Sequence, residues 1–170
     1  MSVNVRYGIS GSSPIGEQTQ TDFHQYDVAA TLRLPWQWYH SSGWGLSTRL
    51  VLSGGALTGA KETNLIATAV PVVAFGSQDE RFSIDMGGGG ALLSDYKFGE
   101  QNFGGPFQFV WTFGVNLGLF GPVGLAYHFQ HYSDATIYGH DSRGSICTSS
   151  KSSTGFDRST LNGLRICSDA

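Results

Sequence analysis

A histidine and a serine two residues apart, His131 and Ser133, form the pair in this sequence with the most readily stated chemistry. They end a strand-like stretch at residues 121–133. Side chains two apart on a strand point to the same face, with their Cα atoms about 7 Å apart, so the imidazole can reach the hydroxyl. A serine oxygen beside a basic imidazole is the arrangement of a nucleophile and its general base. The residues alone also allow a polar strand end that enters a loop.

The element that would carry this pair is one of seven runs with apolar residues at alternate positions or on both faces. Most of these runs are about 10–13 residues long. Ordinary strands average about five or six residues, whereas a tilted strand that crosses a bilayer needs about 9–11. The lengths therefore favour a membrane barrel. The runs cover residues 3–9, 26–34, 44–53, 64–75, a stretch that starts at Phe82, 107–117 and 121–133.

The two faces of these runs differ in character. One face is aromatic and aliphatic, and we expect Phe107, Phe109, Trp111 and Phe113 to face lipid. The other face is small or polar, with charged residues that could pair inside a narrow lumen: Asp27, Arg33, Arg49 and Asp85. The predicted fold is all-β, a small antiparallel transmembrane β-barrel of eight strands. A soluble lipocalin-like barrel, with the faces inverted, is the alternative that parity alone leaves open.

The composition narrows the classes of partner. The net charge is −3, which gives no reason to expect nucleic-acid binding. No run of 18 apolar residues predicts a transmembrane helix, and no signal peptide is visible. Both cysteines follow residue 146, and the histidines lack metal-ligand spacing, so we expect no metal or organic cofactor. We interpret the histidines outside the pair as solvated or interfacial: His24, His40, His128 and His140.

The connections between the runs differ in length. Longer polar ones are expected at 10–22, 53–63, 94–106 and 133–144, and short or aromatic ones near 35–39, 76–80 and 120–122. Bacterial outer-membrane barrels have short periplasmic turns and long external loops. His131 and Ser133 would then lie at the external end of the seventh strand.

On these features the chain resembles the lipid A 3-O-deacylase (PagL) family over most of residues 3–144. The resemblance rests on the segment 34–38 (Leu-Pro-Trp-Gln-Trp), the glycine-rich fifth run, the 102–104 loop (Asn-Phe-Gly) and, above all, residues 131–135 (His-Tyr-Ser-Asp-Ala). It implies an eight-stranded outer-membrane barrel. It also implies a serine-histidine esterase that removes the 3-O-linked acyl chain of lipid A, with Ser133 as nucleophile and His131 as base. The substrate would be lipid A or lipopolysaccharide, and the location the cell outer membrane.

The chain departs from the family in two places. The family often has Asn after the serine, where this chain has Asp134, whose carboxylate would repel a developing oxyanion. The family's third member is an acid near the start of strand eight, and this chain has no clear counterpart. Asp141, in the preceding loop, is a weak candidate.

The last 26 residues lack a strand pattern, so we divide the chain into a barrel at 1–144 and an aberrant polar tail at 145–170. A shifted reading frame explains the tail. With permitted codons, reading from the last base of the Gly144 codon gives Val-Asp-Leu-His-Leu-Leu-Glu-Val-Ile-Tyr-Arg-Phe and then a stop. That strand would restore an acid at the position of Ile146. A natural divergent tail is the alternative.

The sequence thus leaves two classes of function. The first is an outer-membrane ester hydrolase whose present copy is defective. The second is a non-catalytic outer-membrane barrel with a structural or adhesive role.

Overall fold

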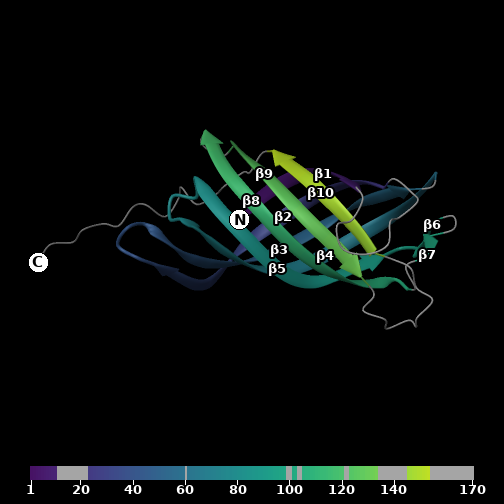
Figure 1. Cartoon of the computed structure of the whole chain (residues 1–170), viewed down its shortest axis with the longest axis horizontal. Coiled ribbons are helices and arrows are strands. Elements are labelled where there is room, and N and C mark those ends of the chain that lie inside the picture. The colour runs from purple at the N-terminus through teal and green to yellow at the C-terminus, as the bar shows by residue number, and fades with distance from the viewer. Residues whose placement is uncertain are drawn as a thin grey trace, which may run out of the picture.

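The computed structural model describes residues 1–10, 23–59, 61–98, 101–102, 105–120, 123–133 and 145–153. Eight long strands in this part of the chain form a closed antiparallel barrel, and Figure 1 shows it from the side. Each strand pairs with its sequence neighbours in the barrel, and the last strand closes the ring by pairing with the first. The predicted all-β barrel is confirmed. The strands are β1 (Ser2–Ser10), β2 (His24–Tyr39), β3 (Trp44–Gly59), β4 (Glu62–Ser77), β5 (Phe82–Leu93), β8 (Phe107–Phe120), β9 (Val123–Ser133) and β10 (Ser145–Ser153).

The two ends of the barrel are distinct. We call the end at which β9 finishes with Ser133 the outer end, and the opposite end the inner end. A small hairpin at the outer end, β6 (Lys97–Phe98) with β7 (Gln101–Asn102), stands outside the barrel sheet and lies at the right of Figure 1. The turns at 40–43 and 78–81 lie together at the inner end, where the Gln78 N–H donates to the Gly43 carbonyl at 2.7 Å.

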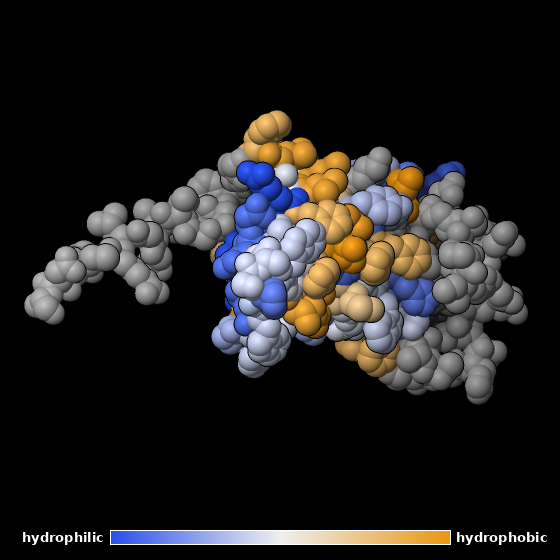
Figure 2. Space-filling model, turned by 60° about the vertical axis from the view of Figure 1, so that its left-hand side comes forward, coloured by the Kyte–Doolittle hydropathy of each residue, from blue (hydrophilic) through white to orange (hydrophobic). Residues whose placement is uncertain are grey.

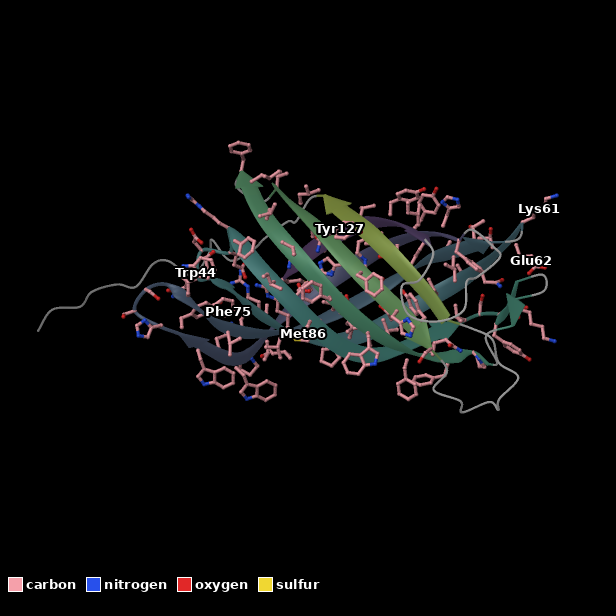
Figure 3. The ribbon with its side chains drawn as sticks, in the orientation of Figure 1. Trp44, Lys61, Glu62, Phe75, Met86 and Tyr127 are labelled. Atoms are coloured by element: carbon pink, nitrogen blue, oxygen red, sulfur yellow. The ribbon has the colours of Figure 1, made fainter. Side chains whose placement is uncertain are left out.

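The aromatic face of the strands points outward, as predicted. The exposed fractions are 37% for Phe109, 63% for Trp111 and 51% for Phe113, and hydrophobic side chains spread over the outer surface in Figure 2. Met86 and Tyr127, labelled in Figure 3, are also exposed. The lipocalin-like alternative is wrong, because it requires this aromatic face to line the lumen. No helix in the described residues is long and apolar enough to cross a membrane.

Two predicted connections are parts of strands instead. The segment 53–63 continues β3 to Gly59 and β4 from Glu62, with Lys61 in the turn at a φ of 68°. The segment 35–39 belongs to β2, and the pairing with β3 shifts register between Arg33 and Gln37. The stretch between them contains Pro35, which has no N–H for a ladder hydrogen bond. Both errors have one cause: backbone pairing continues where side-chain alternation stops.

Residues 145–153 supply the eighth strand of the barrel despite their sequence. The backbone of β10 pairs with β9 from Ser145 opposite Ser133 to Ser153 opposite Leu125, and with β1 on its other edge. Backbone groups can form a ladder with any side chains, whereas lipid contact on the outside requires apolar ones. The prediction that the polar tail can still pair between the seventh and first strands is confirmed. The rest of the tail, from residue 154, lies outside the described residues.

Candidate functional site

His131 and Ser133 lie at the C-terminal end of β9, on its outward face. They continue the outward row that contains Leu125, Tyr127 and Phe129. Both side chains are half-buried, whereas Leu125 and Tyr127 are exposed. The structure therefore places the predicted nucleophile and base on one face, at the outer end of the barrel, as the sequence predicts.

The residue between them, Tyr132, points into the lumen. Its side chain is 4% exposed, and its Oη lies 3.1 Å from Gln25 Oε1 and 3.2 Å from Gln130 Oε1, so the hydroxyl can donate to either. A buried, hydrogen-bonded tyrosine fixes the rotation of the strand, because a one-residue slip would turn it toward lipid. Tyr132 thus holds His131 and Ser133 on the outside.

Tyr132 is one end of a polar chain that crosses the lumen. Gln25 Nε2 donates to Asp27 Oδ2 at 2.7 Å, and Arg6 Nε donates to Asp27 Oδ1 at 2.5 Å. The Arg6 and Asp27 side chains are 6% and 2% exposed. These hydrogen bonds connect β9 to β2 and β1 on the lumenal side of the barrel, behind β10, which lies between β9 and β1 in the wall.

Aromatic residues of β8 flank the pair on the outward face. Trp111 is the cross-strand partner of His131, and Phe109 is the partner of Ser133. On the other side, the backbone of β10 places Cys147 opposite His131 and Ser145 opposite Ser133. Cross-strand partners share a face of the sheet, so these rows are the immediate surroundings of the candidate site.

The structure does not place a third acid beside His131. Asp134, His140 and Asp141 lie outside the described residues. Ile146, where the shifted frame would restore an acid, pairs with the inward-facing Tyr132, and position 147 pairs with His131. In this register the restored Asp would share a face with Tyr132, so it would reach His131 only after a shift of one residue.

The predicted lumenal charges lie inside the barrel but pair with partners that the sequence does not indicate. Asp27 pairs with Arg6, whereas Arg33 and Arg49 both contact Glu80 from the inner-end turn. Asn116 Nδ2 donates to Asp85 Oδ2 at 2.7 Å. These groups, apart from Asp27, line the inner part of the lumen, which contains a cavity of about 380 Å³.

His128 also lines this cavity, so its interpretation as solvated or interfacial is wrong. Its Nε2 lies 3.1 Å from Asn116 Oδ1, and its Nδ1 lies 3.8 Å from Asp85 Oδ1. The side chain fits inside because its cross-strand neighbour is Gly114, where an added Cβ would come within 2.7 Å of the imidazole. Parity along β9 could have found it, since His128 has the same parity as Gln130 and Tyr132. Among the described side chains, no group of three His, Cys, Asp or Glu residues could hold a metal ion.

The outer part of the lumen, beneath the candidate site, is packed. Its buried apolar cluster includes Phe23, Leu57, Ile66, Val110 and Tyr132. A packed lumen leaves the outward face as the surface on which His131 and Ser133 can meet a substrate.

Comparison with known proteins agrees with this geometry. A family model described as lipid A 3-O-deacylase (PagL) matches residues 24–144, which is more than half of the chain. The chain belongs to the PagL family. No curated protein matches its sequence.

A solved PagL structure has the same fold. The crystal structure of the outer membrane enzyme PagL superposes with a TM-score of 0.72, at 19% sequence identity, over 91% of this chain and 99% of that chain. At that identity the likeness shows the fold alone. The PagL model covers His131 and Ser133 and ends at residue 144, immediately before β10.

Proposed function

We propose that this protein is an outer-membrane ester hydrolase that removes the 3-O-linked acyl chain from lipid A by serine-histidine catalysis. The observation that carries the proposal is the shared outward face of His131 and Ser133 at the outer end of β9, in a chain of the PagL family. A lipid ester at the head-group boundary can meet that face directly, whereas it cannot enter the packed lumen behind it.

The bonds that form and break in this chemistry involve these two side chains, the ester and water. Ser133 Oγ attacks the ester carbonyl carbon while His131 accepts the hydroxyl proton. The tetrahedral intermediate collapses, the sugar 3-oxygen leaves with the proton from His131, and the acyl chain stays on Ser133. Water, deprotonated by His131, then attacks the acyl-serine, and His131 returns the proton to Ser133 Oγ as the fatty acid leaves. No metal or organic cofactor takes part in this mechanism.

The remaining roles are expectations from the residues. Asp141 is the weak candidate for the acid that orients His131. Asp134 follows the nucleophile directly, so the oxyanion must be stabilised by backbone N–H groups or by groups elsewhere, because a carboxylate would oppose the developing charge.

The outward surface supports a position in the outer membrane. The outward side chains are aromatic and aliphatic along the barrel, and Trp36, Trp38 and Trp44 lie exposed near the inner end, as an interfacial girdle requires. Three of the four connections at the Ser133 end, β1–β2, β5–β8 and β9–β10, are longer than the inner-end turns, whereas the β3–β4 turn at 60–61 is short. Long connections at one end match the external side of bacterial barrels. Lipid A of the outer leaflet would then be level with the candidate site.

We propose further that residues 145–170 are an aberrant tail and that this copy is impaired. The β10 sequence, Ser-Ile-Cys-Thr-Ser-Ser-Lys-Ser-Ser, occupies a strand with one face toward lipid. A lysine at the bilayer midplane costs about 2–4 kcal/mol, and less near the interface. This polar strand also favours the second candidate function, a non-catalytic outer-membrane barrel with a structural or adhesive role.

The mass of lipid A after incubation with the purified barrel in detergent separates the two functions. A hydrolase reduces the mass by one 3-O-linked acyl chain, and Ser133→Ala abolishes the change. Unchanged lipid A with the original chain and with a chain carrying the twelve-residue replacement strand would favour the non-catalytic barrel.

A further inference from the structure

Trp111 lies between the candidate site and an unusual pair of outward glycines. Gly88 on β5 pairs with Trp111 on β8, which pairs with His131 on β9; the next row is Gly90, Phe109 and Ser133. The rows therefore connect the run Gly87–Gly90 to the two proposed catalytic residues across one intervening strand.

The inward and outward glycines of this run have different reasons to be glycine. A Cβ at Gly87 or Gly89 would collide with the backbone of β4, so the barrel itself excludes side chains there. The atoms nearest to a Cβ at Gly88 would be Cδ2, Cε3 and Cζ3 of the Trp111 ring, each at 3.7 Å, which is ordinary contact. Packing of the barrel therefore tolerates alanine at 88, although glycine within a strand is the less stable choice.

The contacts show how the β8 aromatics lie. The Trp111 ring extends from β8 over Gly88, and the Phe107 ring extends over Gly90, where an added Cβ would come within 2.8 Å of Cε2. Trp111 remains 63% exposed in this position, more than Phe109 or Phe113 on the same strand. A large flat apolar surface is thus held open toward lipid on β8, the strand next to the one that contains His131.

We propose that Trp111, resting on Gly88, positions the acyl chain of the ester that Ser133 attacks. A tryptophan offers a large rigid contact surface at low conformational-entropy cost, which suits alignment of a flexible saturated chain. A side chain larger than alanine at 88 would lift the ring off β5 and tilt it toward His131, on its other side. The inference rests on the proposed function and adds Trp111 and Gly88 as positioning residues.

Binding can be measured without turnover on the full-length chain with Ser133→Ala, which leaves the ester intact. The probe is a glucosamine 3-O-ester with a dibrominated acyl chain, which quenches tryptophan fluorescence on contact, compared with a dibrominated phosphatidylcholine at equal mole fraction in detergent micelles. The chain has four tryptophans, and Trp36, Trp38 and Trp44 lie near the inner end, so the Trp111→Phe variant assigns the signal.

We expect saturable quenching by the ester that disappears in Trp111→Phe. Gly88→Leu should weaken ester binding about tenfold, the effect of losing roughly two buried methylene contacts, and Gly88→Ala should bind like the original chain. If Gly88→Leu does not fold, Trp111→Ala should give the same loss of affinity, measured by isothermal titration calorimetry because this variant lacks the reporting ring. Equal quenching by the two lipids, or equal affinity in the Leu and Ala variants, would overturn the proposal.

Hydrolysis distinguishes failure of this proposal from failure of the proposed function. Specific ester binding without acyl release by any form would retain the role of Trp111 and remove the catalytic one. Acyl release that is unaffected in Gly88→Leu, with an unchanged KM, would retain the proposed hydrolysis and remove the role of Trp111.

Discussion

The sequence contains two further His-x-Ser pairs. His140 and Ser142 lie outside the described residues, and His40 and Ser42 lie in the turn between β2 and β3 at the inner end. His40 Nδ1 lies 3.3 Å from Ser42 Oγ and 3.4 Å from Ser41 Oγ, and it accepts the Ser42 N–H at 3.3 Å. All three residues are exposed. Contact between imidazole and hydroxyl is therefore also present at the inner end, away from the outer leaflet that would hold lipid A.

The residue in the middle of each pair marks the difference. Ser41 is exposed in the turn, whereas Tyr132 is buried and tied to Gln25 and Gln130, which fixes the outward face of β9. In a turn, neighbouring side chains make contact because they are close in sequence. In β9, the buried Tyr132 fixes the orientation of the strand, so its outward side chains face the lipid around the barrel. A His-x-Ser spacing therefore indicates a catalytic pair only where the structure holds both side chains toward the substrate.

The sharpest test substitutes both pairs in parallel, in the chain with the twelve-residue replacement strand. Ser133→Ala and His131→Asn should each reduce lipid A deacylation by about three orders of magnitude or more, because an activated nucleophile and its base act as a unit. Ser42→Ala and His40→Asn should leave it unchanged. Mass spectrometry of lipid A gives the readout. Similar losses from the two pairs, or near-full activity of either β9 variant, would show that the dyad is wrongly assigned.

The replacement strand itself should change folding and activity together. Exchanging the stretch from Ser145 for Val-Asp-Leu-His-Leu-Leu-Glu-Val-Ile-Tyr-Arg-Phe removes the lysine, which gains up to about 2–4 kcal/mol of insertion free energy. Both forms, expressed with a signal peptide, can be compared by heat-modifiability gels. Equal folding and equal deacylation by the two forms would contradict the shifted-frame account.

The same exchange should move the register of the last strand by one residue. In the replacement, the Asp shares its parity with the terminal Phe and with the Tyr before it, so lipid-facing aromatics place the Asp outward beside His131. In the present register position 146 pairs with the inward Tyr132. Disulfide trapping of paired cysteines on β9 and the replaced strand reports the register, and retention of the present pairing would remove that Asp as the third acid.

Loss of the anchor behind the dyad should cost less. Tyr132→Phe leaves buried glutamine oxygens without their donor, and we expect a loss of about 1–3 kcal/mol in the free energy of unfolding by urea in micelles. Tyr127→Phe, on the exposed face of the same strand, is the matched control and should have almost no effect. A loss of the same size in both would mean that the buried contacts of Tyr132 do not stabilise the strand.

The smallest effect is expected at the turn. Ser42→Ala removes one exposed contact to His40 and should change stability by less than about 0.5 kcal/mol. The free energy of unfolding of Ser42→Ala in urea should therefore equal that of the original chain within error, whereas a clear loss would show that the β2–β3 turn contributes to barrel stability. In the second inner-end turn, hydrogen bonding from Ser77 and then from the Arg81 N–H lowers the pKa of Asp79 below its usual value.

The sequence predicts the strands where side-chain alternation and backbone pairing coincide, as for Phe107–Phe120 and the outward aromatics. It fails where they separate: β3 runs through Ser53–Gly59, and β10 pairs although its residues do not alternate. The outward placement of His131 and Ser133 follows from parity with Tyr127. The partners of the buried charges could not be predicted, because which residues meet across a closed lumen depends on the stagger of all eight strands.

The hydrogen-bonded side chains from Tyr132 through Gln25 and Asp27 to Arg6 have a consequence for how the sequence of such a protein can change in evolution. Their hydrogen bonds connect β9 to β2 and β1 inside the lumen, on both sides of β10. Closure of the ring is therefore supported by contacts that do not involve the side chains of β10. We therefore expect side-chain changes in the final strand to affect lipid contact and catalysis more than closure of the ring.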